Sequence, residues 1–574
     1  MRSRLANAQH GLWRMNPWLA LAALLLPVPG LAEPQQMVAA AHPLAVKAGL
    51  EVLNRGGSAL DAAVAVQMML GVVEPHEAGI GGGGFLLHYD AKTKSISAYD
   101  GRESAPMGAR SAMFLGQDGK PLPYFEAMFS GLSVGVPGVV AMLDMAHREH
   151  GRLPWRDLFG LAIATARDGF VVSPRLAKAL AATTNEAFPR AGPIFGLIRG
   201  FRQDPAVRAV YYNGDGSTKI RGDRVKNPAL ASTMELIASA GARALYEGPV
   251  AGQIVQRVLS HERPGTLALS DLASYRPVKR EPLCGPYRIW IVCGMPPPSA
   301  GGIAILQMLG LLEPFDLAKD KPNDLRAIHL IAEAGRLAFA DVLHYLADPA
   351  FVPVPTQALV APAYIAERRK LISLDRAMEP PGEAVAPGYV EHGTSHISIV
   401  DREGNAVAFT TTIESTFGAE MMVGGFLLNN ELTDFSPVPE LAGKPVANRV
   451  EPGKRPRSSM APTFVLDRDR RLVLVVGSAG GQHIIGDTLH ALVGMLDWNL
   501  STQAALDLPR VLNTNGPTAL EDKGVLPLQG TNLRKLGHQL QVQQHEGGLT
   551  AIRSKADGWE GAADPRRDGV AQGN

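Results

Sequence analysis

The architecture of this chain follows from the stretch Gly393-Thr394-Ser395-His396-Ile397-Ser398-Ile399-Val400-Asp401, which lies deep inside the sequence. Its composition predicts a strand that begins with Thr394. Cleavage of the peptide bond before Thr394 would leave one residue with both a hydroxyl nucleophile and a free α-amine. Such an amine can take the proton of the hydroxyl, which is a weak nucleophile until a base removes that proton. The alternative is an ordinary threonine in a strand, with no chemical role.

A hairpin is predicted to extend from this strand. Asn405–Thr412 has the composition of a second strand, and Asp401-Arg402-Glu403-Gly404 is a turn signal between the two. Folding the hairpin puts Thr394 beside Thr411 or Thr412, depending on whether the turn contains a bulge. The sequence therefore predicts a neighbouring threonine for Thr394 but leaves its identity open.

Length and charge narrow the kind of partner. At 574 residues the chain is long enough for several domains or for one large interleaved unit. Its apolar content of 46% and charged content of 19% are those of an ordinary globular protein. The 56 Lys and Arg residues nearly balance the 55 Asp and Glu residues, so no net field favours nucleic acid. We therefore expect a small-molecule partner and no nucleic acid.

The N-terminus predicts a cleavable signal peptide over residues 1–32. Arg2, Arg4 and Arg14 precede the apolar run Trp18–Leu26, and small residues precede a cut after Ala32. The run is too short to span a bilayer as a helix, so we expect no stable membrane span. A membrane anchor is the alternative. The prediction is a periplasmic or secreted protein.

The two cysteines, Cys284 and Cys293, are predicted to face each other in a second hairpin. A two-residue turn at Arg288-Ile289 would place them directly opposite, and cross-strand disulfides favour pairs whose side chains approach closely. Export makes such a bond possible. Arg-Ile is a poor two-residue turn, however, so two buried free thiols are the alternative.

Periodicity and cap signals predict the other elements. Helices are expected at Ala39–Leu53, Ser58–Leu70, Leu325–Ala347 and Ile485–Trp498, and strands at Phe85–Tyr89, Phe426–Leu428 and Arg471–Val476. The middle of the chain, residues 114–275, is expected to be mostly helical. Pro353–His392 is rich in Pro and charge without periodicity, which predicts an exposed connector that can move after a cut.

Several familiar catalytic signatures are absent. The stretch Gly477-Ser478-Ala479-Gly480-Gly481 lacks the glycine that a serine-hydrolase elbow needs two residues before the serine, because Val476 occupies that position. The glycine run 79–84 leads into a strand, whereas a phosphate loop leads into a helix with Lys-Ser/Thr. No His-Glu-x-x-His motif and no Cys/His ligand spacing occurs. We therefore expect neither a metal nor another cofactor.

A series of short motifs follows the signal peptide and covers essentially all of the remaining chain. They are Pro75-His76-Glu77-Ala78-Gly79-Ile80-Gly81-Gly82-Gly83-Gly84-Phe85, Asp100-Gly101-Arg102-Glu103, Met295-Pro296-Pro297-Pro298-Ser299-Ala300-Gly301-Gly302, Thr394-Ser395-His396-Ile397-Ser398, Leu428-Asn429-Asn430-Glu431-Leu432-Thr433-Asp434-Phe435-Ser436, Lys454-Arg455-Pro456-Arg457-Ser458-Ser459-Met460, Gly477-Ser478-Ala479-Gly480-Gly481 and Gly561-Ala562-Ala563-Asp564-Pro565-Arg566-Arg567. In this order they resemble the γ-glutamyltransferase (γ-glutamyltranspeptidase) family of the N-terminal nucleophile hydrolase superfamily.

The resemblance implies a proenzyme that cuts itself between Gly393 and Thr394. The products would be a large subunit, residues 33–393, and a small catalytic subunit, residues 394–574. Together they would form an α/β fold of the four-layer αββα sandwich type. A glycine at position 393 suits such a cut, because a residue without Cβ tolerates the backbone strain of the attack.

The resemblance also implies the mature reaction. The Thr394 hydroxyl would attack the γ-amide carbonyl of glutathione or another γ-glutamyl compound and form a γ-glutamyl ester. Water, or an amino acid or peptide acceptor, would then take the γ-glutamyl group. The backbone N–H groups of Gly480 and Gly481 are expected to face the oxyanion. Thr412 is expected to form a hydrogen bond with the nucleophile.

A γ-glutamyl group ends in an amino acid zwitterion, which needs a cation and an anion at fixed positions. By resemblance, the α-carboxylate is expected at Arg102, Ser458 and Ser459, and the α-ammonium at Asp434, supported by Glu431 and Glu414. Two rival functions stay open. One is a cephalosporin (glutaryl) acylase on the same scaffold, whose substrate lacks the α-amine. The other is an uncleaved, inactive periplasmic protein that only binds γ-glutamyl peptides or a partner.

Overall fold

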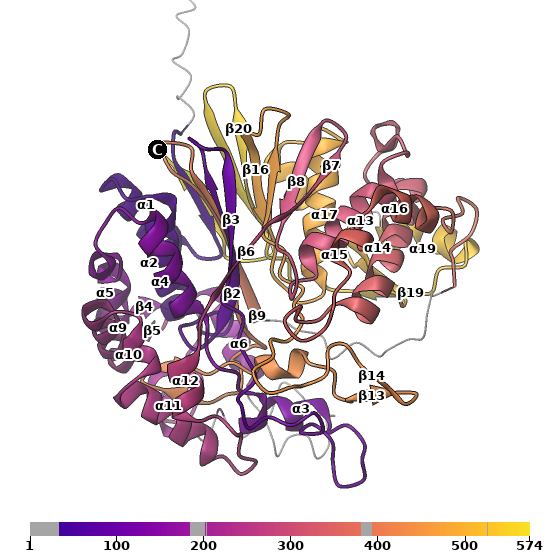
Figure 1. Ribbon diagram of the computed structural model, residues 1–574. Coiled ribbons are helices and arrows are strands. Elements are labelled where there is room, and N and C mark those ends of the chain that lie inside the picture. The colour runs from indigo at the N-terminus through magenta and orange to yellow at the C-terminus, as the bar shows by residue number, and fades with distance from the viewer. Residues whose placement is uncertain (1–33, 184–200, 202–203, 380–392, 525) are drawn as a thin grey trace, which may run out of the picture.

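The structure is a computed structural model that describes residues 34–183, 201, 204–379, 393–524 and 526–574 (Figure 1). The predicted signal peptide lies outside the described residues. Within them, no helix combines the length and the apolar character that a membrane crossing requires. The chain folds into a mixed α/β architecture in which two large sheets lie between groups of helices (Figure 1).

The first sheet contains the strand of Thr394. Its seven strands run in the order β22-β1-β9-β10-β2-β3-β6. Their bounds are β1 (Met37–Ala40), β2 (Gly83–Asp90), β3 (Ser95–Asp100), β6 (Val278–Arg280), β9 (Gly393–Val400), β10 (Ala406–Glu414) and β22 (Val570–Gly573). The predicted hairpin is confirmed as β9 and β10, an antiparallel pair in the middle of the sheet. All residues of both strands are buried.

The second sheet has six strands in the order β21-β20-β16-β15-β8-β7. Their bounds are β7 (Leu283–Tyr287), β8 (Trp290–Gly294), β15 (Thr463–Leu466), β16 (Leu472–Gly477), β20 (Thr550–Lys555) and β21 (Gly558–Ala563). The two sheets pack face to face, and side chains of β9 contact the second sheet. The Ser398 hydroxyl lies 3.0 Å from that of Thr550, and a Cβ on Gly477 would lie 2.3 Å from the His396 ring.

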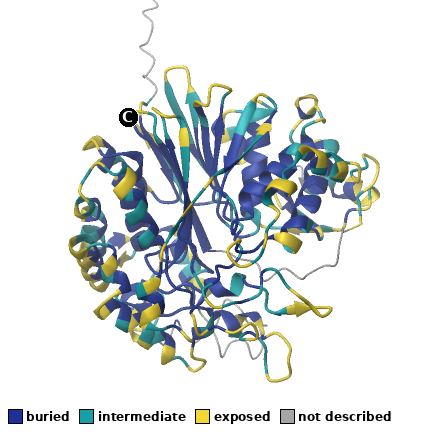
Figure 2. Ribbon diagram, in the orientation of Figure 1, coloured by how far each residue is buried: buried dark blue, intermediate teal, exposed yellow. Residues whose placement is uncertain are grey.

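Because side chains alternate along a strand, Thr394 shares the face of His396 and Ser398 and points into the interface between the sheets. Helices cover the outer faces (Figure 1). Those against the first sheet are α1 (Pro43–Asn54), α2 (Ala59–Val73) and α4 (Val139–His150), and those against the second are α13 (Gly301–Leu312) and α17 (His483–Leu496). The long helix α14 (Leu325–Tyr345) packs against α13. Figure 2 shows the central part of the sheets as buried and the strand ends and edges as more exposed. Thr394 lies in the buried central part.

The remaining elements are short or peripheral. The helices are α3 (Tyr124–Met128), α5 (Gly160–Asp168), α6 (Pro174–Ala182), α8 (Pro205–Tyr211), α9 (Pro228–Ala240), α10 (Arg243–Tyr246), α11 (Pro249–Leu259), α12 (Leu269–Ser274), α15 (Thr356–Leu359), α16 (Pro362–Arg369), α18 (Thr502–Asp507) and α19 (Leu526–Lys535). The strands are β4 (Phe170–Val171), β5 (Arg224–Val225), β11 (Met422–Val423), β12 (Phe426–Leu427), β13 (Glu440–Leu441), β14 (Lys444–Pro445), β17 (Val511–Asn513), β18 (Thr518–Glu521) and β19 (Leu540–Gln543).

The start of the first helix differs from the prediction. A helix was expected from Ala39, but Met37–Ala40 is a strand that pairs with both β9 and β22. Pairing on both sides outweighs the helix propensity of the alanines. The helix begins at Pro43 instead, with the His42 side chain as its N-cap. The second helix starts as predicted, because Ser58 and Asp61 form a capping box.

The connector before the predicted cut also differs from the prediction in part. Its first half contains α15 and α16 rather than an irregular chain. Pro362 starts α16, and Ile365 packs against α13 where Gly310 leaves room, since a Cβ there would lie 2.9 Å from Ile365. Residues 380–392 lie outside the described part.

The two cysteines lie opposite each other, as the turn at Arg288-Ile289 predicted. Cys284 pairs with Cys293 across β7 and β8, and a disulfide joins them. Arg288 takes a left-handed conformation with φ 55°, which lets an unfavourable residue pair form the two-residue turn.

Candidate active site

Thr394 faces Thr412 across the β9–β10 pair. Of the two neighbours that the sequence allowed, the register selects Thr412. The two hydroxyl oxygens lie 3.4 Å apart, and both side chains are fully buried. The hydroxyl of Thr394 is therefore held beside a second hydroxyl and away from bulk water.

The Thr412 hydroxyl also contacts the peptide bond that precedes Thr394. It donates to the Gly393 carbonyl oxygen and accepts a hydrogen bond from the backbone N–H of Glu414 at 2.8 Å. The second contact depends on a bulge between Thr412 and Glu414, where Glu414 takes a φ of 76°. A carbonyl that accepts a hydrogen bond is polarised toward attack at its carbon.

Gly393 is required for space. A Cβ at this position would lie 2.7 Å from the Glu414 carbonyl oxygen and from the Ser415 carbonyl carbon. A glycine was expected here because it tolerates strain, and the structure adds that the backbone of Glu414 and Ser415 comes too close for a side chain.

The loop with Gly480 and Gly481 starts where β16 passes His396, because Gly477, the last residue of β16, packs on that ring. The two glycines have positive φ values of 105° and 59°, which a side chain would disfavour. Within the described part of the chain, their N–H groups have no hydrogen-bond acceptor. The loop leads directly into α17, whose N-terminus favours negative charge.

Arg102 lies at the centre of a second, charged group. Its guanidinium forms ion pairs with Glu431 and Asp434 and donates to the Arg457 carbonyl at 2.9 Å. The side chains of Arg102 and Glu431 are fully buried, whereas that of Asp434 is 18% exposed. The residues expected to bind opposite ends of a zwitterion therefore bind each other in this structure.

Glu414 joins the charged group to the threonines, because it pairs with Gly393 across the bulge. Its carboxylate contacts Asn430 and the Tyr124 hydroxyl, the latter at 3.3 Å. Burial, together with the negative charge of Asp434, raises the pKa of Glu414 to about 8. Burial likewise raises the pKa of Asp434, although Arg102 opposes the rise. The charged group thus contains carboxyl groups that bind protons tightly.

The predicted serines lie at the edge of this group. Ser458 is buried, its hydroxyl accepts the Met460 N–H at 3.2 Å, and its backbone pairs with Ser299. It follows Arg457, whose carbonyl contacts Arg102. Ser459 is half-buried, and among the described residues its side chain has no hydrogen bond to the charged group.

Sequence reasoning did not assign roles to three residues that contact this site. Tyr124 bonds to Glu414, Glu77 accepts the Thr394 N–H at 2.7 Å, and Arg567 donates to the Thr394 carbonyl at 2.6 Å. Glu77 and Arg567 stood inside motifs, but nothing in their spacing connects them to Thr394. Only the fold brings the three positions together.

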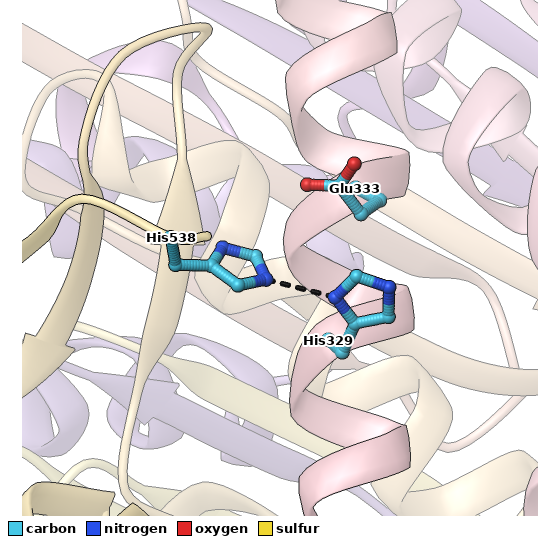
Figure 3. A group of neighbouring side chains, drawn as sticks. All are labelled: His329, Glu333 and His538. Atoms are coloured by element: carbon cyan, nitrogen blue, oxygen red, sulfur yellow. Dashed lines mark hydrogen bonds between the residues drawn. The ribbon is translucent and has the colours of Figure 1, made fainter. Parts of the chain in front are cut away.

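One group of described side chains has spacing that would suit a metal ion: His329, Glu333 and His538, with ligand atoms within 4.8 Å (Figure 3). These atoms already have partners. His329 Nδ1 lies 2.8 Å from His538 Nε2, and His329 Nε2 lies 2.7 Å from the Ser373 carbonyl. Arg336 pairs with Glu333 at 3.2 Å and offsets the charge that would attract a cation. These three side chains therefore form a buried hydrogen-bonded contact between α14 and the loop before β19, and their arrangement is explained without a metal ion.

Comparison with known proteins identifies the family of the chain. The Gamma-glutamyltranspeptidase family model matches residues 45–574. A glutathione hydrolase proenzyme of Bacillus subtilis is 37% identical over 558 residues, which cover 94% of this chain and 91% of the relative. The glutathione hydrolase proenzyme of Escherichia coli is 37% identical over 545 residues, covering 93% and 90%. A solved cephalosporin acylase from Bacillus halodurans has a TM-score of 0.81 at 28% identity, covering 95% of this chain and 98% of that one. The chain belongs to the gamma-glutamyltranspeptidase family.

Proposed function

We propose that this chain is an exported, self-cleaving γ-glutamyltransferase and hydrolase with Thr394 as its nucleophile. Its substrates are glutathione and related γ-glutamyl compounds, and water or amino acid and peptide acceptors take the γ-glutamyl group. The observation that carries the proposal is the contact of the Thr412 hydroxyl with both the Gly393 carbonyl and the Thr394 hydroxyl. An ordinary strand threonine has no need of that arrangement.

The precursor step uses these contacts. The Thr394 oxygen attacks the Gly393 carbonyl carbon, which the Thr412 hydroxyl polarises. The carbon–nitrogen bond breaks, the nitrogen takes the proton that the hydroxyl loses, and an ester joins Gly393 to the Thr394 oxygen. Water hydrolyses this ester and frees the Thr394 hydroxyl and amine. Residues 33–393 and 394–574 then remain together as the two subunits of one four-layer αββα sandwich.

The mature step repeats the attack on a γ-amide. The neutral Thr394 amine takes the proton of the hydroxyl while its oxygen bonds to the γ-carbonyl carbon. The N–H groups of Gly480 and Gly481 stabilise the oxyanion, and loss of one such donor typically costs about 3–4 kcal/mol. The carbon–nitrogen bond of the substrate breaks, and the proton passes from the Thr394 ammonium to the leaving amine. Water or an acceptor amine attacks the resulting ester by the same route.

Substrate binding proceeds by exchange of ion pairs. The α-carboxylate of the γ-glutamyl group replaces the carboxylates of Glu431 and Asp434 at the Arg102 guanidinium. Ser458 and Ser459 are further hydrogen-bond donors to it. Asp434 and Glu431, released from Arg102, then receive the α-ammonium, and Glu414 supports them. Each charge of the zwitterion meets a partner that the free protein already holds buried, so binding leaves no unpaired charge.

The alternative is a glutaryl acylase, which the similarity to a cephalosporin acylase favours. A glutaryl group has no α-ammonium, so it would leave the released carboxylates of Glu431 and Asp434 without a partner. Hydrolysis of a γ-glutamyl anilide and of the matching glutaryl anilide by the same protein decides between the two. We expect the γ-glutamyl substrate to be preferred by about 10- to 150-fold in kcat/KM, because a hydrogen bond to a charged group contributes about 1.5–3 kcal/mol.

A matched variant sharpens that assay. Asp434→Asn should lower hydrolysis of the γ-glutamyl anilide and leave the glutaryl anilide unchanged or improved. Equal loss on both substrates would count against a role of Asp434 at the amine. A purified protein that stays uncleaved and hydrolyses neither substrate would favour the inactive binding protein.

A further inference from the structure

A buried ion-pair network surrounds the backbone of Thr394, with Glu77 at its centre. The Thr394 N–H donates to Glu77 Oε2 at 2.7 Å. Arg567 donates to the Thr394 carbonyl at 2.6 Å, and the same guanidinium nitrogen lies 3.4 Å from Glu77 Oε2. One carboxylate and one guanidinium therefore hold the two ends of the Thr394 backbone. Both side chains are almost completely buried, so bulk water does not compete for these contacts.

The position of Glu77 is fixed by the end of α2. The Glu74 carbonyl, at the C-cap of that helix, accepts the N–H of Glu77 at 2.9 Å. The His76 carbonyl accepts the N–H of Phe417, from the loop after β10, at 3.2 Å. These backbone bonds aim the Glu77 side chain at the first residue of β9.

The second oxygen of the Glu77 carboxylate binds Arg175, at the start of α6. Arg175 Nε and Nη2 donate to Glu77 Oε1 at 3.1 and 2.5 Å. Arg175 also contacts Glu546 at 3.3 Å. Although burial opposes the charged form, Arg175 and Arg567 hold the pKa of Glu77 below its ordinary value. Glu77 is therefore a carboxylate at neutral pH, shared between two arginines and the Thr394 nitrogen.

We propose that Glu77 is a positioning residue for the α-amine of Thr394, whose ammonium form it stabilises, and that Arg567 opposes that stabilisation. This rests on the proposed function, since the nitrogen becomes an amine only after the cut. A carboxylate at this distance favours the ammonium form, which cannot take a proton from the hydroxyl. The Arg567 guanidinium contacts the same carboxylate oxygen and the Thr394 carbonyl, so its positive charge limits that effect and keeps a neutral amine accessible near physiological pH.

Other charged or titratable groups face the same region and belong in any account of its pH dependence. They are Glu74, His76, Arg175, Glu546 and Asp568. Burial, with Glu77, raises the pKa of Glu74 to about 7, and burial lowers the pKa of His76 to about 3. His76 is thus neutral near physiological pH. Besides the Thr394 amine, Glu74 is the group of this set whose pKa lies in that range.

The test is the pH profile of kcat/KM for a γ-glutamyl anilide between about pH 5 and pH 10, which brackets the usual amine pKa near 8. Glu77→Gln keeps a hydrogen-bond acceptor and removes the charge, so the acidic limb should move down by about 1–2 pH units. Arg567→Gln removes the opposing charge and should move the limb up by about 1 unit. Glu77→Asp keeps the charge and should restore the wild-type limb. Glu235→Gln, which removes an exposed carboxylate paired with Arg167 on another part of the surface, is the matched control and should not move it.

Shifts of opposite sign for Glu77→Gln and Arg567→Gln support the proposal, because a general loss of folding would lower activity without that sign pattern. If Glu77→Gln fails to fold or to cleave itself, the other two variants still test the proposal. An acidic limb that moves up in Arg567→Gln and stays at the wild-type position in Glu77→Asp supports the proposal. An unmoved limb in both charge-removing variants, or shifts of one sign, overturns it and leaves Glu77 as a structural ion pair. Wild-type protein without activity overturns the proposed function itself, and this inference with it.

Discussion

Two neighbouring regions, the threonine pair and the charged group around Arg102, are held in place in different ways. Thr394 and Thr412 are fixed by the strand register and by backbone hydrogen bonds of β9 and β10. Arg102, Glu431 and Asp434 are fixed by ion pairs among their own side chains. Under the proposed function, the first region is complete before any substrate arrives, whereas the second would exchange ion-pair partners to admit one. The proposal therefore has preorganised chemistry and a recognition step coupled to breaking buried ion pairs.

Removing the Thr394 hydroxyl should break the first region completely. Thr394→Ala is expected to lose activity on γ-glutamyl anilide by at least about three orders of magnitude, because the reaction loses its nucleophile. Thr394→Ser keeps a hydroxyl and should retain measurable turnover. The measurement is steady-state hydrolysis with both variants purified alike. Activity in the alanine variant close to that of wild type would exclude Thr394 as the nucleophile.

Removing the cation should break the second region and spare the first. Arg102→Met is expected to lower kcat/KM by about 10- to 150-fold, mainly through KM, since a hydrogen bond to a charged group contributes about 1.5–3 kcal/mol. Arg102→Lys should be intermediate because a lysine lacks the planar fork. Self-cleavage, followed by gel electrophoresis, should continue in both. A wild-type KM in Arg102→Met would remove Arg102 from substrate binding.

The protonation of Glu414 should make the pocket sensitive to pH. Its pKa is about 8 in the folded protein against an ordinary 4.5, so the folded state binds this proton more tightly than the unfolded state. Its contribution to stability is complete at pH values below the ordinary pKa and is lost as the pH rises through about 8. The melting temperature should therefore fall as the pH rises from about 4.5 to about 8, and in Glu414→Gln that fall should be smaller by a few degrees. A melting-temperature profile parallel to wild type would contradict the assigned environment of Glu414.

A change outside both regions should leave the chemistry alone. Cys284→Ser with Cys293→Ser removes a disulfide whose residues are 9 positions apart. Closing a loop of this length stabilises a protein by roughly 2–3 kcal/mol in the chain-entropy model, so the melting temperature should fall. The kcat/KM for γ-glutamyl anilide, measured below the melting transition, should not change. A kinetic defect would mean that the second sheet positions the site more directly than its contacts indicate.

The same contrast explains what the sequence could predict. The hairpin of β9 and β10 follows from local composition and a turn signal, so the neighbour of Thr394 could be narrowed to two residues. The choice of Thr412, the bulge at Glu414 and the contact with Gly393 depend on the register, which the turn signal alone did not determine. The strand at Met37–Ala40 was missed because its partners, β9 and β22, lie far away in the sequence.

The charged pocket was predicted as a set of residues but not as an arrangement. Resemblance named Arg102, Glu431 and Asp434, yet it assigned them to opposite ends of a ligand rather than to each other. Tyr124 and Glu77 could not be found at all from spacing, because each reaches the site from a separate element. Ion pairs between distant segments form only when the whole fold is assembled, and no local pattern encodes them.

The most direct test of the account is the N-terminal sequence of the fragments in purified protein. We predict two fragments, with the smaller one beginning Thr394-Ser395-His396, and a single uncut chain for Thr394→Ala. Wild-type protein that stays in one piece, or a small fragment that begins at another residue, would contradict the claim that Thr394 is the nucleophile and frees its own amine.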